Sequence, residues 1–244
     1  GPALYYKLTG FKPARELAEK QSRYMRYHSD YWSPDGQFIA EKHYHAHTIY
    51  MIGMLEYALA AGDKELQEFL KRSYDWALTP DAGMDRLTGF TPEFAKPGHP
   101  SSEGCAVADV LILGTMFSSA GIGDYYEDVE RWARNHFAEI QLTPSKVDQM
   151  VRRGQPMEPK KILYNETVDR VAERNVGGFG SWCAANDWWI GWQTTDNMIM
   201  HCCTGNCTRA IYYVWENILD HNDGKLKVNM LLNRASQWAD VHSY

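Results

Sequence analysis

The sequence repeats one helical pattern three times, and this repeat limits the fold more than any other feature. In each copy an apolar segment ends at a glycine, and a segment that opens with proline or acidic residues follows. The three glycines are Gly10, Gly62 and Gly121, spaced 52 and 59 residues apart. Glycine is favoured just beyond the last turn of a helix, whereas proline and acidic residues are favoured in a first turn. Helical hairpins that recur at this spacing indicate a solenoid or a closed αα-toroid.

Other patterns in the sequence also support a mainly helical fold. Apolar residues recur at helical spacing over Leu66–Ala77 and Val129–Ile140, and a last helix is expected over Thr208–Leu219. Residues 221–224 then predict a turn, and alternating side chains over Lys225–Leu232 predict a strand. We therefore expect a mainly α-helical chain with β-structure confined mostly to its C-terminal end.

Composition and charge argue against several classes of partner. The 244 residues carry a formal net charge of −6, and like charges do not cluster in blocks. Binding to nucleic acid or to an anionic membrane surface is therefore not expected. No apolar run approaches the about 20 residues that a membrane-spanning helix needs. The first residues lack the pattern of a signal peptide, so the sequence leaves cytoplasm and periplasm both open.

The longest loop between the predicted hairpins spans residues 143–200 and is expected to be functional. It contains the tryptophan-rich segment Trp182–Trp192, in a chain that has 9 Trp and 15 Tyr in total. Because indole rings stack on sugars, we expect Trp182 and Trp188 to line a carbohydrate-binding cleft. Ordinary packing of large side chains is the alternative.

The strongest chemical signal is the motif Glu103-Gly104-Cys105 together with the doublet Cys202-Cys203. A disulfide between adjacent cysteines would strain the peptide that joins them, so the doublet needs another explanation. Zinc binds thiolates, imidazoles and carboxylates, usually four at a time. The two motifs supply four such side chains: Glu103, Cys105, Cys202 and Cys203. Both motifs precede predicted helices, whose N-termini favour thiolates, although buried and inert cysteines are the alternative on the residues alone.

Other polar groups lie in the predicted loops. The run His43–His47 has histidine at alternate positions and leads into an apolar helix, on which alternate side chains do not share a face. We therefore expect His45 and His47 to contact substrate hydroxyls, or to cap the helix, rather than to bind a second metal ion. Glu93 precedes Phe94 in a loop rich in proline and glycine. It is either a solvated carboxylate or one whose pKa is raised by apolar surroundings.

These motifs resemble those of glycoside hydrolase family 127, the β-L-arabinofuranosidase type. Glu103-x-Cys105 opens one helix, and Cys202-Cys203-x-x-Asn206-x-x-Arg209 opens a later one that is followed by a turn into a strand. His45-Ala46, followed by Thr48 and an apolar helix, is similar to a segment that lines the pocket of that family. The resemblance extends from Ala40 to the end of the chain.

The resemblance implies a fold, a metal and a mechanism. The family fold is an (α/α)6 barrel followed by a β-sandwich, so residues 1–221 would form part of the barrel and residues 222–244 the start of the sandwich. The family's zinc ligands correspond to Glu103, Cys105, Cys202 and Cys203. Cys202 would be the nucleophile in a retaining hydrolysis of arabinose-containing glycans, with its thiolate held ionised by zinc. Glu93 would be the general acid and base, and sulfur would replace the second carboxylate of the usual pair.

The same residues also fit a protein without catalytic activity. The chain would then be a helical module that binds carbohydrate or has a structural role, in which zinc only ties helices together. The nucleophile of a catalytic zinc site faces a cavity, whereas a structural site is closed. Because the predicted barrel is incomplete, we also expect the chain to be a segment of a larger catalytic domain, which by itself can lack activity.

Overall fold

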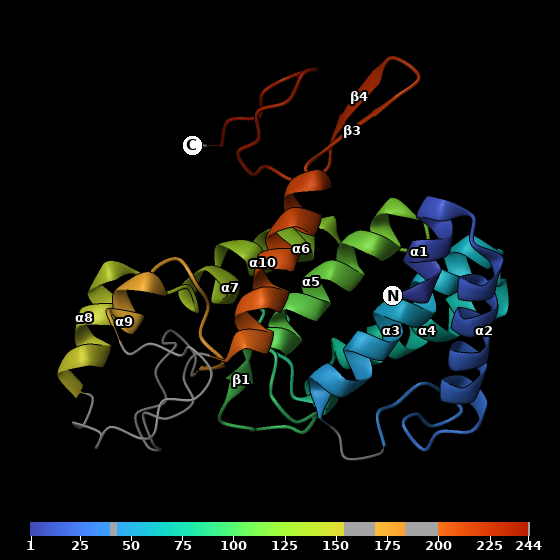
Figure 1. Cartoon of the computed structure of the whole chain (residues 1–244), viewed down its shortest axis with the longest axis horizontal. Helices are drawn as coiled ribbons and strands as arrows, with labels where there is room; N and C mark the ends of the chain where they lie inside the picture. The colour runs from blue at the N-terminus through green and yellow to red at the C-terminus, as the bar shows by residue number, and fades with distance from the viewer. Residues whose placement is uncertain (40–42, 154–168, 184–199, 244) are drawn as a thin grey trace.

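The computed structural model describes residues 1–39, 43–153, 169–183 and 200–243, and most of these residues are helical (Figure 1). The helices are α1 (Pro2–Thr9), α2 (Lys12–Tyr27), α3 (Tyr44–Ala61), α4 (Lys64–Ala77), α5 (Gly104–Ser119), α6 (Tyr126–Arg134), α7 (His136–Glu139), α8 (Pro144–Arg153), α9 (Val171–Arg174) and α10 (His201–Glu216), with a 3-10 turn at Pro80–Ala82. The strands are β1 (Ser102–Glu103), β2 (Trp182–Cys183), β3 (Leu219–Asn222) and β4 (Lys225–Val228), in two antiparallel pairs. The prediction of a mainly α-helical chain is confirmed. None of the described helices is both long and apolar enough to span a membrane.

The repeated pattern corresponds to three helical hairpins, α1–α2, α3–α4 and α5–α6. Gly10 and Gly62 each follow the last residue of a helix in a left-handed conformation, with φ of 72° and 70°. Gly121 has the same conformation shortly after α5, with φ of 69°. Asp63 caps α4 by accepting a hydrogen bond from the Leu66 amide at 3.0 Å. The repeat is therefore confirmed at the level of hairpins, while closure into a toroid or barrel stays a prediction.

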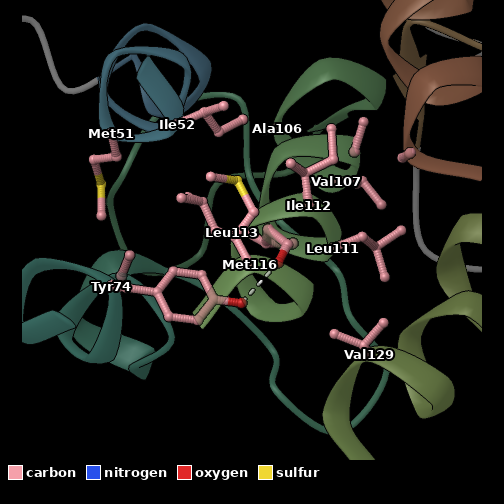
Figure 2. Packing of buried hydrophobic residues seen from close by; sticks show 14 of the residues in the cluster. Met51, Ile52, Tyr74, Ala106, Val107, Leu111, Ile112, Leu113, Met116 and Val129 are labelled. Carbon is pink, nitrogen blue, oxygen red and sulfur yellow. Dashed lines mark hydrogen bonds between the residues drawn. The ribbon is translucent and has the colours of Figure 1, made fainter. Parts of the chain in front are cut away.

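Helix α5 is the centre of the fold. It packs against α3, α6 and α10 (Figure 1), and residues 104–117 are all buried. A helix that is apolar on nearly every side is typical of one enclosed by others. Figure 2 shows this packing, including the Tyr74 hydroxyl, which donates to the Val110 carbonyl at 2.7 Å. Gly114 allows the close approach of α6, because a Cβ there would lie 2.6 Å from Val129 Cγ2.

Two expectations for the second half of the chain are wrong. The helix expected to continue to Ile140 breaks at Asn135, whose φ of −105° and ψ of −111° are not helical. The Asn135 side chain donates instead to the Arg131 carbonyl at 2.7 Å, a local bond that competes with helix continuation. The connection over residues 143–200 was expected to be a loop, but its described part contains α8 and α9.

The last helix begins and ends earlier than expected. It spans His201–Glu216 rather than Thr208–Leu219. The additional turns at its start pack on the beginning of α5, where a Cβ at Gly104 would lie 3.3 Å from Cys203 Cβ and the Cys207 thiol donates to the Gly104 carbonyl at 3.2 Å. Its end is earlier because the Asn217 side chain donates to the Tyr213 carbonyl at 2.8 Å, after which Leu219 enters β3.

The C-terminal hairpin is short and largely exposed. Strand β4 begins at Lys225, as the alternation predicts, but ends at Val228 rather than Leu232. Asp223 and Gly224 at the turn have positive φ of 51° and 72°. This is the type I′ geometry that two-residue hairpin loops favour. The start of a β-sandwich over residues 222–244 stays a prediction.

Candidate metal centre

Three cysteine sulfurs meet where α5 and α10 begin. Cys105 lies in the first turn of α5, and Cys202 and Cys203 lie in the first turn of α10. Figure 1 shows both helices starting at the same edge of the molecule, close to β1. The three Sγ atoms all lie within 4.8 Å of one another. Because sulfur ligands about 2.3 Å from zinc are roughly 4 Å apart at the corners of a tetrahedron, this group could hold a metal ion.

The cluster is closed on one side and open on the other. Cys105 and Cys203 are fully buried, whereas Cys202 is exposed, with its Sγ 3.9 Å from that of Cys203. The open side faces a shallow cavity of about 390 Å³ that is widely open to solvent. The cavity is lined by His45, Ile49, Cys105, Cys202, Gly205, Asn206 and Arg209.

A short two-stranded sheet positions the start of α5. Glu103 in β1 pairs with Trp182 in β2, and the Gly104 amide donates to the Ser181 carbonyl at 2.8 Å. Gly104 has no room for a side chain, because a Cβ would lie 2.5 Å from the Gly180 carbonyl oxygen. Glycine at this position therefore lets the chain that leads into β2 approach the helix that carries Cys105.

The cluster favours a single thiolate. The Cys105 thiol donates a hydrogen bond that lowers the pKa of Cys203 to about 7, and the Ser181 hydroxyl adds to this effect. The same donation raises the pKa of Cys105. Burial raises the pKa of Cys202, and the neighbouring Cys203 charge raises it further. These shifts favour ionisation of Cys203 before Cys105 and Cys202, and a metal ion that binds all three sulfurs would displace the remaining protons.

Glu103, the fourth predicted ligand, is not part of the group of three sulfurs and bonds to a histidine instead. Its Oε2 is 2.8 Å from His43 Nε2, and this hydrogen bond raises the pKa of His43. The Glu103 charge also adds to the rise in the pKa of Cys105, after the bond to Cys203 and burial. The structure thus brings three of the four predicted ligands together, and coordination by Glu103 stays a prediction.

His45 and His47 face different parts of the protein. His45 lines the cavity, with its Nδ1 2.7 Å from Oδ2 of Asp109. Burial alone would lower the pKa of His45, but the Asp109 carboxylate outweighs it and the pKa is raised. His47 is fully buried, stacked on Phe38 at a centroid distance of 4.2 Å, with Nε2 3.0 Å from the Tyr31 carbonyl. Residues two apart on a helix face nearly opposite sides, so of these two only His45 has the position that contact with a substrate requires.

Glu93 is half-buried near the pair of His43 and Glu103. Its carbonyl accepts from the Tyr44 amide at 2.9 Å, and its amide donates to the Ser101 carbonyl at 3.0 Å. The Ser101 hydroxyl also donates to the Glu93 carboxylate at 3.3 Å. After Glu103, the Glu93 charge contributes to the raised pKa of His43, which places this carboxylate on the His43 side of the site. Its role as general acid and base stays a prediction.

Trp182 is the predicted sugar-stacking residue that the structure describes. It is half-buried in β2, opposite Glu103, and lies beside the site without joining the cavity lining named above. Trp188 and the rest of the tryptophan-rich segment, from residue 184 onward, lie outside the described residues. Their contact with sugar rings stays a prediction.

Reasoning from the sequence missed Asp109, which bonds to both helices that flank α5. It is fully buried and accepts hydrogen bonds from side chains of α3 and α10. One signal could have found it, because Asp109 is the charged residue in an otherwise uncharged helix. A buried carboxylate needs partners, so its presence predicts a polar contact with a neighbouring element.

Comparison with known proteins adds no assignment. No protein-family model matches the sequence, and neither a curated protein nor a solved structure matches it. The candidate site is therefore defined by geometry. Three sulfurs converge, two of the three cysteines line an open cavity, and the buried carboxylate of Asp109 lies behind them.

Proposed function

We propose that this protein is a retaining glycoside hydrolase that acts on arabinose-containing glycans, with zinc-bound Cys202 as its nucleophile. One observation carries the proposal: Cys202 is the exposed member of the sulfur cluster and lines the cavity. A structural zinc site encloses its ligands, whereas a catalytic site leaves the reacting position open. His45, Asn206 and Arg209 around the same cavity would bind sugar hydroxyls.

The donor set suits zinc. Cys105, Cys202 and Cys203 offer soft thiolates, and Glu103 offers a carboxylate. Bound zinc would keep the thiols ionised near neutral pH. The His43 ring, which already bonds to Glu103, would orient that carboxylate as hydrogen-bonded partners of metal ligands commonly do.

Two side chains of the protein would carry the reaction. Cys202 Sγ bonds to the anomeric carbon while the glycosidic C–O bond breaks, and Glu93 gives its proton to the departing oxygen. In the second step Glu93 takes a proton from water, the water oxygen bonds to the anomeric carbon, and Cys202 leaves as the thiolate. Two successive inversions give net retention of configuration.

The proposal includes the finer architecture. The three hairpins would form part of an (α/α)6 barrel, and the C-terminal hairpin would begin a β-sandwich. In support, three helices contribute cavity residues from their N-terminal turns, namely His45 of α3, Cys105 of α5 and Cys202 of α10. Such a shared rim is expected where the connections between hairpins open at one end of a barrel.

A second candidate is a non-catalytic module that binds carbohydrate or has a structural role. The observation that favours it is the complete burial of Cys105 and Cys203. A metal ion held there would tie α5 to α10, as structural zinc ties helices together. In that case the wild-type protein would have no glycosidase activity, and loss of Cys202 would only weaken metal binding.

Assays of purified, zinc-loaded variants with aryl and natural-type arabinosides distinguish these candidates. Cys202→Ser should lower turnover by at least about 10³-fold, because an alkoxide forms far less readily than a thiolate. Cys203→Ser should reduce metal content together with activity. Glu93→Gln should slow the natural-type substrate more than the aryl substrate, whose leaving group needs no protonation.

Cys207→Ser is the matched control for these variants. Cys207 is buried in α10 outside the sulfur cluster, and its Sγ donates to the Gly104 carbonyl at 3.2 Å, which a serine hydroxyl can also do. Its zinc content and turnover should match the wild type. Wild-type turnover by Cys202→Ser, or a protein with no stoichiometric zinc, would rule out the proposed mechanism.

A further inference from the structure

Asp109 is a fully buried carboxylate whose two oxygens bond to different helices. Toward α3, Oδ2 accepts from His45 Nδ1 and from Thr48 Oγ1, both at 2.7 Å. Toward α10, Oδ1 accepts from Asn206 Nδ2 at 2.8 Å and lies 3.5 Å from Arg209 Nη2. An isolated buried carboxylate is costly, and these donors offset the cost. Asp109 therefore joins α3 to α10 through α5.

The partners of Asp109 belong to the cavity beside Cys202. Three of them line it: His45, Asn206 and Arg209. Another buried carboxylate, Asp128 in α6, differs in this respect. It bonds to Arg86 at 2.6 Å and to Arg131 at 3.0 Å, and neither arginine lines the cavity. The Asp109 network is thus directed at the site, whereas the Asp128 network supports packing.

On the substrate side, the hydrogen bond to Asp109 determines which nitrogen of the neutral His45 ring carries the hydrogen. With the Asp109 carboxylate as the acceptor, that nitrogen is Nδ1. Nε2 lies on the other side of the ring, away from Asp109. The hydrogen bond therefore sets both the orientation of the ring and the atom that it offers to a ligand in the cavity.

On the metal side, Asn206 of α10 bonds to α5, and these are the two helices that carry the cysteines. Its amide nitrogen donates to Asp109 Oδ1 and to the Cys105 carbonyl, the latter at 3.1 Å. Asn206 comes one turn after Cys202, and Asp109 comes one turn after Cys105. The contact therefore lies directly behind the sulfurs, and its loss would let α10 shift relative to α5.

We propose that Asp109 is a positioning residue that keeps the metal side and the substrate side of the cavity in register. Through Asn206 it holds the sulfurs of α10 against that of α5, and directly it holds the ring of His45. The part that concerns substrate rests on the proposed function. The part that concerns the metal rests only on the sulfur cluster.

Substitutions of Asp109, compared with a control substitution at Asp128, test this proposal. Asp109→Asn keeps the size of the side chain but replaces one of its two acceptor oxygens with an NH₂ group. In either orientation of the amide, this group faces a hydrogen-bond donor, Asn206 or His45. Asp109→Ala removes both sets of contacts. Asp128→Asn is the matched control, because it neutralises a buried, arginine-paired carboxylate that has no contact with the cavity lining.

Two readouts separate positioning from a loss of stability. Affinity for Zn²⁺, measured by competition with a chromophoric chelator, should fall about 10–100-fold in Asp109→Ala, as it does when hydrogen-bonded partners behind metal ligands are removed. Asn206→Ala should cause a similar loss, and the double variant should lose little more, since both act through one contact. The ¹⁵N NMR shifts of the imidazole should show His45 protonated at Nδ1 in the wild type and altered in Asp109→Asn. Asp128→Asn should leave both readouts unchanged.

The proposal is overturned if the Asp109 variants lose only stability, as Asp128→Asn does, while zinc affinity and the His45 shifts stay at wild-type values. If Asp109→Ala does not fold, Asp109→Asn and Asn206→Ala decide by the same readouts. A wild-type protein without glycoside turnover, in which both readouts still respond, would reject the proposed function and leave the role of Asp109 supported.

Discussion

The two ends of α5 are equally buried but carry different chemistry. At the N-terminal end, Cys105 and Asp109 make directed polar contacts with α3 and α10. At the C-terminal end, Leu111–Phe117 is mostly apolar and fits against Tyr74 and Val129 (Figure 2). Burial alone therefore does not mark a functional residue. The end of α5 that forms the candidate site is marked by buried charged or reactive groups whose partners come from other helices.

The two ends should also respond differently to substitution. Apolar packing is not directional, so a lost side chain costs stability in proportion to the volume removed. A polar network depends on each partner, because the loss of one leaves the others unpaired. Changes at the apolar end should therefore lower stability alone, and changes at the polar end should also weaken metal binding.

Leu111→Ala should have the largest effect on stability. Leu111 is 0% exposed, so its removal leaves a cavity and should lower the free energy of unfolding by about 2–5 kcal/mol. Urea denaturation measures this loss, and zinc affinity of the folded variant should be unchanged. Leu87→Ala is the control, because Leu87 is 71% exposed and should change stability by at most about 0.5 kcal/mol. A tenfold loss of zinc affinity in Leu111→Ala would mean that the two ends are not separable.

Gly104→Ala should have a smaller effect on stability and a clear effect on the metal. The new Cβ would lie 2.5 Å from the Gly180 carbonyl oxygen, so the chain before β2 must shift, at a cost of about 1–3 kcal/mol. Zinc affinity should fall in the same variant. Gly205→Ala is the control, since no atom lies within 4 Å of a Cβ at that position in α10. If Gly104→Ala and Gly205→Ala both bind zinc as tightly as the wild type, the expected link between the N-terminal end of α5 and metal binding is wrong.

Tyr74→Phe should have the smallest effect. It removes the hydroxyl that donates to the Val110 carbonyl at 2.7 Å and should lower the free energy of unfolding by about 0.5–1.5 kcal/mol. Zinc affinity should not change. The control is Tyr24→Phe, in which the ring is 59% exposed and stability should stay near the wild type. A lower zinc affinity in Tyr74→Phe would show that packing at the apolar end of α5 affects the positions of the sulfurs.

The features that could be predicted from the sequence are the local ones. Gly10 and Gly62 end their helices for reasons of backbone conformation that need no knowledge of the rest of the chain. The turn at Asp223-Gly224 is a similar case. The scarcity of soft ligands in this chain predicts that Cys105, Cys202 and Cys203 form one set, and the structure brings their sulfurs together.

The features that could not be predicted depend on contacts between helices. The sequence alone does not show at which residue α3 begins, so it does not distinguish His45 from His47. Both lie on the helix, and their positions around its axis place His45 in the lining of the cavity and His47 in the core. The early start of α10 depends on its packing against α5. Asp109 has no local motif, since its partners come from two other helices.

The bond between Asp109 and Asn206 closes a loop of 97 residues, and this has a consequence for how the protein forms. Hairpins are made from neighbours in the chain and can fold early, whereas closing a long loop costs entropy that only later contacts offset. During synthesis, α3 and α5 can therefore pair before α10 has left the ribosome. Until then Cys105 and Asp109 have no partner from α10, so the candidate metal site and the cavity form together in one late step.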